Sequence, residues 1–301
     1  MSKNTERVST LERIIAASVE ASPHSRDIIE AFRPVLIRKA ILVDELNARD
    51  DTAVIAEGSR LADGVPLVLP EDLVPGRQTL NSIALSLVPS TIEGFPSLAG
   101  DLETCREQMR SGDLDLSECL VCNPEDGMDI VAAWSRQKGV SARALEFLAR
   151  LTLRVFLKNQ AERLAHLIDD AKWNRGYCPI CGSAPLIASI RQDQGTRRLH
   201  CLDCGHSWTF SRVICPDCGN EDQSSMTYFY IQDSENQTAF VCEKCRRYLL
   251  TQGKVSDLTL FDAEVCSMGL AHLDAVLQRK GFSPMVSCEW NVFPASDATE
   301  G

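Results

Sequence analysis

The chain has 301 residues, of which 44% are apolar and 24% are charged. This composition is typical of a folded globular protein and argues against long disordered segments, and the length allows two or three domains. The formal net charge of −11 opposes binding to polyanions such as DNA, RNA or an anionic membrane surface.

The sequence predicts a cytoplasmic protein without membrane insertion. Its N-terminus has no basic start followed by an apolar run, and no stretch of about 18 apolar residues occurs. In a reducing compartment, closely spaced cysteines are more often metal ligands or catalytic thiols than disulfides. The total of 13 cysteines is odd, so a monomer cannot pair them all.

Residues 1–174 are predicted to form a helical domain. Ser9 and Glu12 fit a capping box at the start of the first long helix. Pro34 predicts a kink or a break in the second helix. The clearest helix follows Ser141, where apolar residues keep a period near 3.6 for about 30 residues.

Short β-strands bounded by turns replace the helices in the C-terminal half, for example at 186–192 and 197–200. We expect an α+β protein in which the helical N-terminal domain precedes two tandem β-modules of the rubredoxin or zinc-ribbon type. The predicted boundaries are 175–212 for the first metal ribbon, 213–254 for the second, and 255–301 for a short C-terminal helix and tail.

Four Cys-x-x-Cys knuckles lie within residues 178–245. This spacing lets both sulfurs of a knuckle face one ion, and two knuckles together supply a tetrahedral set of four thiolates. We therefore predict two metal sites. Pairing in chain order gives Cys178, Cys181, Cys201 and Cys204 for the first site and Cys215, Cys218, Cys242 and Cys245 for the second. Spacing alone leaves a crossed pairing open, with the first knuckle joining the third and the second joining the fourth.

A glycine follows the second cysteine in three knuckles, at Gly182, Gly205 and Gly219, and suits a backbone that folds tightly under a metal. The fourth knuckle departs from this pattern with Arg246. A ribbon of this size has too little core to fold without its metal. Four thiolates accept zinc or a single iron ion. Thiol redox chemistry, unmetallated cysteines and an iron–sulfur cluster are the less favoured alternatives.

The remaining cysteines and two histidines are interpreted as structural. Cys119 and Cys122 form a fifth Cys-x-x-Cys in the helical part, where residues three apart can be buried side by side. His200 and His206 flank the second knuckle and are assigned to ordinary ribbon positions. Isolated cysteines are more often small buried residues than ligands. Three are of this kind: Cys105, Cys266 and Cys288.

The motifs favour a binding or assembly protein over an enzyme. The sequence contains no GxSxG, P-loop, strand-linked GxGxxG or HExxH motif. Four-thiolate sites are closed and offer no position to a substrate. Nucleic-acid binding, a common role of such ribbons, is disfavoured because residues 176–254 hold eight Lys or Arg and eight Asp or Glu.

The run GYCPICGSAPLIASI, followed by RRLHCLDCGHSW, RVICPDCGN and VCEKCRRYL, resembles the formate dehydrogenase accessory protein family, FdhE. The later segment LDAVLQRKGF resembles the closing helix of that family. These motifs cover residues 176–282. Over the first 174 residues the resemblance consists of length and helical character.

The resemblance implies a cytoplasmic maturation factor that binds the catalytic subunit of formate dehydrogenase before export by the twin-arginine pathway. It implies iron in rubredoxin-type sites in preference to zinc, gives each of the eight knuckle cysteines a ligand role, and assigns no catalytic residues. Two other functions stay open. One is a metal-thiolate redox protein that adjusts or senses the redox state of its client, and the other is a zinc-ribbon protein that binds nucleic acid.

Overall fold

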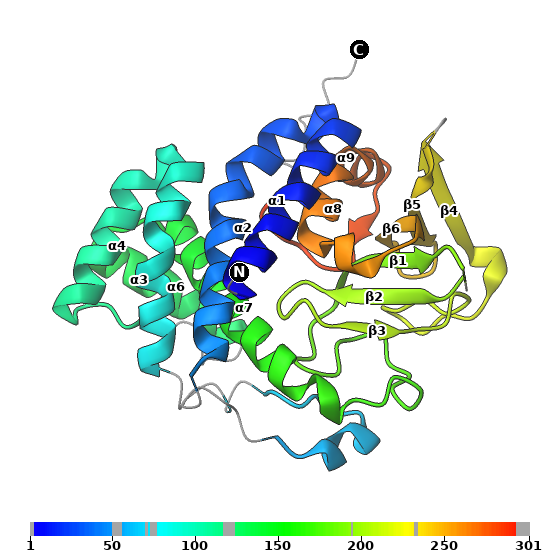
Figure 1. The fold of residues 1–301 in the computed structure, drawn as a ribbon, viewed down its shortest axis with the longest axis horizontal. Helices are drawn as coiled ribbons and strands as arrows, with labels where there is room; N and C mark the ends of the chain where they lie inside the picture. Colours follow the sequence, from blue (N-terminus) through cyan, green and yellow to red (C-terminus); the bar gives the residue numbers. More distant parts are fainter. Residues whose placement is uncertain are drawn as a thin grey trace.

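A computed structural model describes residues 3–49, 56–69, 72, 77–116, 124–193, 195–231 and 234–292. Helices build the N-terminal half and a mixed β-sheet builds most of the C-terminal half (Figure 1). The predicted α+β class, with a helical half followed by a β half that contains the cysteine knuckles, is confirmed. The helices are α1 (Lys3–Ala21), α2 (Arg26–Asn47), α3 (Arg77–Gly94), α4 (Ala99–Ser111), α6 (Pro124–Lys138), α7 (Ala142–Leu164), α8 (Ala263–Gly269) and α9 (Ala271–Arg279).

The N-terminal helices differ from their predicted limits. Helix α1 begins at Lys3, so Ser9 and Glu12 lie inside it and the predicted capping box is wrong. The polar residues that precede Ser9 are compatible with a helix, which therefore starts earlier. Helix α2 continues through Pro34, so no break occurs there. Packing of its apolar face in the core outweighs the local cost of the proline.

Helix α7 is the centre of the helical half. It is buried along most of its length, with 15 of its 23 residues inside the protein. It contacts α2, α3, α4 and α6, and a helix surrounded in this way needs apolar residues on most of its faces. The helix is shorter than the sequence predicts, because the chain turns into a 3-10 helix at Ala165–Leu167.

Within the described residues, the two predicted ribbons are joined in one seven-stranded sheet. Its main path runs β3-β2-β1-β6-β5-β4, and β7 pairs with β6. The connection between the ribbons is the parallel pair of β1 and β6, in which Ile187 lies opposite Leu250. The predicted hairpin of β1 and β2 is confirmed. The strands are β1 (Pro185–Arg191), β2 (Arg197–Cys201), β3 (Ser207–Thr209), β4 (Met226–Ile231), β5 (Ser234–Cys242), β6 (Arg247–Val255) and β7 (Ser283–Pro284).

The C-terminal segment forms two helices where the sequence predicts one. Helix α8 ends at Gly269 and α9 begins at Ala271, with Leu270 between them. The predicted stop at Gly281 is confirmed, since this residue has a positive φ of 81°. Asp262 caps α8 through a 3.0 Å bond from the Val265 amide to its side chain.

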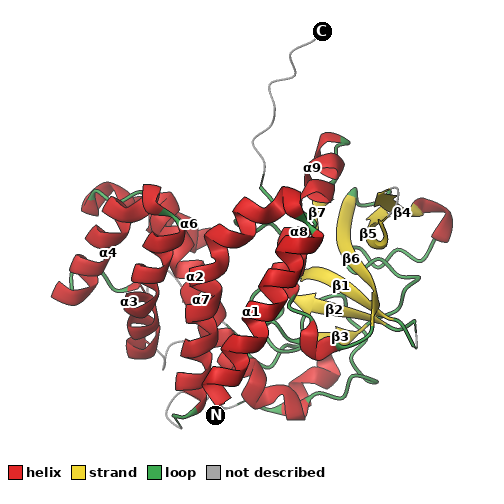
Figure 2. Ribbon diagram, turned by 45° about the horizontal axis from the view of Figure 1, so that its top comes forward, coloured by secondary structure: helices red, strands yellow, loops and turns green. Residues whose placement is uncertain are grey.

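The two halves of the protein pack against each other through α1, α7 and α8. Helix α1 lies beside α8, next to the sheet (Figure 2). Lys39 on α2 forms a half-buried ion pair with Glu264 on α8, with 2.6 Å between nitrogen and oxygen. Arg154 on α7 is 2% exposed and pairs with Glu289 in the C-terminal segment at 2.7 Å. Among the described residues, no helix is both long and apolar enough to cross a membrane.

A buried carboxyl group connects α9 to the sheet. The hydroxyl of Tyr248 on β6 donates a 2.7 Å hydrogen bond to Oδ1 of Asp274 on α9. The other oxygen of Asp274 has no hydrogen-bond partner among the described residues. Burial raises the pKa of Asp274 to about 7. The folded protein therefore holds this group most favourably in its neutral form.

We expect Asp274 to lower the free energy of unfolding as the pH rises from about 4 to about 7. In this window the folded chain binds more protons than the unfolded chain. The stabilisation is complete below the pKa that the carboxyl group has in the unfolded chain, and it is lost as the pH rises through the pKa in the folded chain. The rise in the pKa of Asp274 corresponds to a change of roughly 4 kcal/mol in the free energy of unfolding. Denaturant unfolding of the wild type and Asp274→Asn across this range measures the effect. A difference between them that does not change with pH would contradict this assignment.

Candidate metal centres

The first cluster of cysteines joins the turn before β1 to the turn after β2. Its four sulfurs lie within 4.8 Å of one another. The separations are 3.4 Å between the sulfurs of Cys178 and Cys204 and 3.4 Å between those of Cys181 and Cys201. Pairing of β1 with β2 produces this cluster, because the hairpin returns the second knuckle to the first.

The second cluster joins the turn before β4 to the turn between β5 and β6. Its four sulfurs also lie within 4.8 Å of one another. Cys215 and Cys245 are 3.8 Å apart, as are Cys218 and Cys242. The knuckles are therefore brought together in chain order, and the crossed arrangement left open by the spacing does not occur.

The donor set fits a tetrahedral metal ion. Four sulfurs at about 2.3 Å from a metal are about 3.8 Å from one another. The second cluster has this separation, and the first is a few tenths of an ångström tighter. Each cluster could hold one metal ion, and the geometry does not distinguish iron from zinc.

The fourth knuckle keeps the backbone shape of the others despite its arginine. Gly219 has a φ of 68°, and Arg246 takes the equivalent position with a φ of 59°. The amides of these two residues donate to the carbonyls of Cys215 and Cys242 at 3.0 and 2.9 Å. Arg246 is supported by an ion pair with Glu243 at 2.6 Å and by stacking over Phe282. These contacts offset the strain that a left-handed backbone conformation causes in a residue other than glycine.

The two clusters differ in their access to solvent. In the first cluster Cys178, Cys201 and Cys204 are buried and Cys181 is half-buried. In the second cluster Cys218 is exposed. A chelator or an alkylating reagent therefore meets fewer obstacles at the second cluster.

Burial also affects the protonation of several of these thiols. It raises the pKa of Cys178, Cys201 and Cys204 well above the ordinary thiol range. In the second cluster it raises the pKa of Cys215 to about 11. At neutral pH a metal must displace protons from these sulfurs, so acid weakens metal binding.

A polar network ties the first cluster to the helical half. The hydroxyl of Ser183 donates a 2.6 Å bond to Asp203, which lies between Cys201 and Cys204 in the second knuckle. Asp203 is also 3.5 Å from the Nε of Arg154 on α7. Because Arg154 pairs with Glu289 as well, one buried cation holds α7, the knuckle and the C-terminal segment together.

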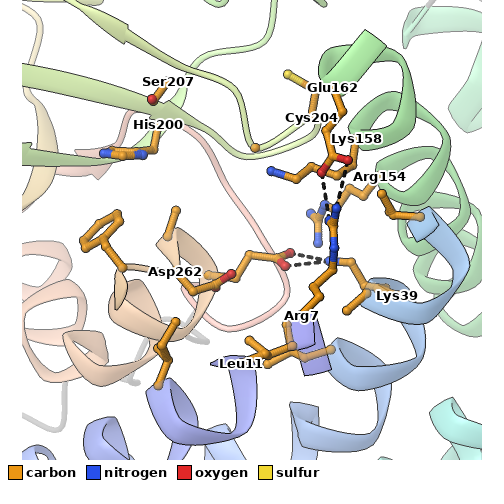
Figure 3. Close-up of a pocket in the computed structure, with 18 of the residues that line it drawn as sticks. Arg7, Leu11, Lys39, Arg154, Lys158, Glu162, His200, Cys204, Ser207 and Asp262 are labelled. Carbon is orange, nitrogen blue, oxygen red and sulfur yellow. Dashed lines mark hydrogen bonds and ion pairs between the residues drawn. The ribbon is translucent and has the colours of Figure 1, made fainter. Parts of the chain in front are cut away.

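A cavity of about 850 Å³ lies between the helical half and the first cluster. Cys204 lines its upper wall in Figure 3, and Arg7, Lys39 and Asp262 line the opposite side. The ammonium group of Lys158 extends toward its interior from α7. Most cations of the wall are paired, for example Arg7 with Glu162 at 2.8 Å.

The other cysteines and the histidines that the sequence singles out lie outside both clusters. Cys105 and Cys288 are buried, and Cys266 is half-buried. His200 is buried and shares a 2.7 Å hydrogen bond with Ser189. His206 is half-buried, and Cys119 and Cys122 lie outside the described residues.

The chain is similar to known proteins in sequence and in fold. The family model described as "FdhE, central domain" matches residues 177–212, which include the first cluster. An FdhE homologue from Aquifex aeolicus is 28% identical over 152 residues, or 48% of this chain and 52% of the relative. One from Shewanella oneidensis is 29% identical and covers 56% of this chain and 58% of the relative. The chain spans about half the length of these curated relatives.

A solved structure shares the fold over nearly the whole chain. The crystal structure of the FdhE protein from Pseudomonas aeruginosa matches with a TM-score of 0.62 and covers 96% of each chain. The sequence identity is 19%, so this likeness concerns the arrangement of the helices and the sheet. It extends the similarity from the cysteine-rich part to the helical half.

We expect the second cluster to release its metal first. In protein loaded with zinc, the exposed Cys218 gives a chelator direct access, so release should occur in two phases. The fast phase should disappear in Cys215→Ser/Cys218→Ser and remain in Cys178→Ser/Cys181→Ser. Absorbance of a zinc-sensitive chelator measures both rates. A single phase in the wild type, or loss of the fast phase in the variant of the first cluster, would contradict the assignment.

Proposed function

We propose that this chain, a member of the FdhE family, is an accessory protein for the assembly of formate dehydrogenase. In this proposal it binds the catalytic subunit in the cytoplasm and carries two mononuclear metal sites. The eight cysteines of the two clusters are the ligands, and iron is favoured over zinc. The observation that carries the proposal is the pair of four-sulfur clusters within a fold and a central domain of the FdhE type.

The metal sites in this proposal are structural and the protein is not an enzyme. A metal held by four thiolates has no free position for a substrate. The ions stabilise the sheet, and the helical half lies against it as a second body. The predicted domain boundaries at residues 174, 212 and 254 remain part of the proposal, with the two ribbons as parts of one sheet.

The edge of the sheet offers a surface for the client. Strand β4 is the last strand on the main path and pairs only with β5 among the described strands. Tyr230 on this strand is 69% exposed. An uncovered edge presents free backbone donors and acceptors, which an extended segment of a partly folded subunit can pair with.

We expect the purified chain to co-elute with the catalytic subunit of formate dehydrogenase that lacks its cofactors. Gel filtration of the mixture measures this. Tyr230→Ser should weaken the complex by about tenfold, since exposed aromatic residues contribute strongly to interfaces. Leu260→Ser removes another exposed apolar side chain, from the 3-10 turn before α8, and serves as the control. Absence of any complex with the unaltered chain would contradict the proposed function.

A redox function is the second candidate, and the exposure of Cys218 is the observation that favours it. Thiol alkylation before and after metal removal separates the two functions. Sulfurs that react quickly in the metal-loaded protein favour redox chemistry, whereas protected sulfurs favour a structural role. Retention on a polyanion column that falls with salt would favour the third candidate, nucleic-acid binding.

A further inference from the structure

Arg197 is a buried cation inside the sheet. It is the first residue of β2 and is 2% exposed. Its guanidinium lies over the rings of Phe210 and Phe240, at 5.3 and 5.4 Å from their centroids. Phe240 belongs to β5, so this cation from the first ribbon lies against the second.

The guanidinium lacks a carboxylate partner. Its Nη2 donates to the carbonyls of Ser211 and Ile214, the second at 2.8 Å. Its Nε and Nη1 have no hydrogen-bond partner among the described residues. Arg197 forms no ion pair with any residue that the structure describes. Arg212 adds a second positive charge nearby. A buried charge without a counter-charge is costly, so an anionic group is expected close by.

The second cysteine cluster is the candidate for this anionic group. Ile214, whose carbonyl accepts from Arg197, shares its peptide group with Cys215 of the cluster. Burial lowers the pKa of Arg197 to about 10, and the charges of Tyr228 and Cys215 act against this change. Four thiolates around a divalent ion carry a net charge of −2, so metal loading places negative charge beside the guanidinium.

We propose that Arg197 is the counter-charge of the second metal site and that it raises the affinity of this site for its metal. The inference rests on the metal-binding part of the proposed function. The first ribbon thus contributes a residue to the metal site of the second. When the metal is absent the guanidinium stays buried without compensation, so metal binding and the cohesion of the sheet depend on each other.

Zinc titration in competition with a chelator tests this proposal. Arg197→Met keeps most of the apolar stem and removes the charge, so zinc affinity of the second site should fall by at least about tenfold while the first site is unchanged. Arg197→Lys keeps a charge and should retain most of the affinity. Arg198→Met is the matched control, because Arg198 is the next residue of β2 and has its own partner, Asp170, at 2.8 Å.

Chelator-treated protein provides a second measurement. Without metal, Arg197→Met should resist denaturant better than the wild type, because it no longer buries an uncompensated charge. Equal affinity of the wild type and Arg197→Met for the second zinc ion would overturn the proposal, as would equal losses in the Met and Lys variants. Failure of the wild type to bind a second zinc ion would instead refute the metal-binding function. Absence of a complex with the client would contradict only the accessory function and would not change the result of the zinc titration.

Discussion

The close approach of four sulfurs in each cluster is the constraint on which the C-terminal half depends. Sulfurs separated by 3.4 to 3.8 Å cannot all be thiolates unless a cation lies between them. One cluster joins the chain before β1 to the chain after β2, and the other joins the chain before β4 to the turn between β5 and β6. The sheet in turn aligns the knuckles, so metal binding and strand pairing support each other.

The parallel pairing of β1 with β6 makes one body of two ribbons. Its consequence is that neither cluster is an independent module. Arg197 reaches from β2 toward Cys215, and Arg154 reaches from α7 to the second knuckle. Each cluster therefore has a buried arginine in its surroundings, although only Arg154 has carboxylate partners among the described residues. The first site is therefore anchored by an arginine with carboxylate partners, whereas the second has an exposed cysteine.

Much of this architecture could be predicted from the sequence because the signals are local. Knuckle spacing depends on a few neighbouring residues, and the FdhE central-domain model matches residues 177–212, which contain the first two of these motifs. The β1–β2 hairpin and the helical half follow from periodicity and turn residues. Helix limits were less predictable, since tertiary packing carries α2 through Pro34 and extends α1 to Lys3.

Contacts between distant segments gave no signal in the sequence. The joining of the ribbons depends on Ile187 meeting Leu250, and neither residue differs from an ordinary strand residue. The partners of Arg154, the burial of Arg197 and the cavity beside Cys204 depend on the packing of the two halves. From sequence alone a charged residue is predicted to be exposed, because only the fold shows which residues cover it.

Metal content decides whether the eight knuckle cysteines hold two ions. Protein purified without oxygen would be analysed for metals, with an optical spectrum and a circular dichroism spectrum before and after chelation. We expect two metal ions per chain, with iron giving thiolate charge-transfer absorption. Removal of the ions should reduce the β-structure signal while the helical signal persists. Fewer than two ions per chain in fully reduced protein, or a sheet unchanged by their removal, would contradict these expectations.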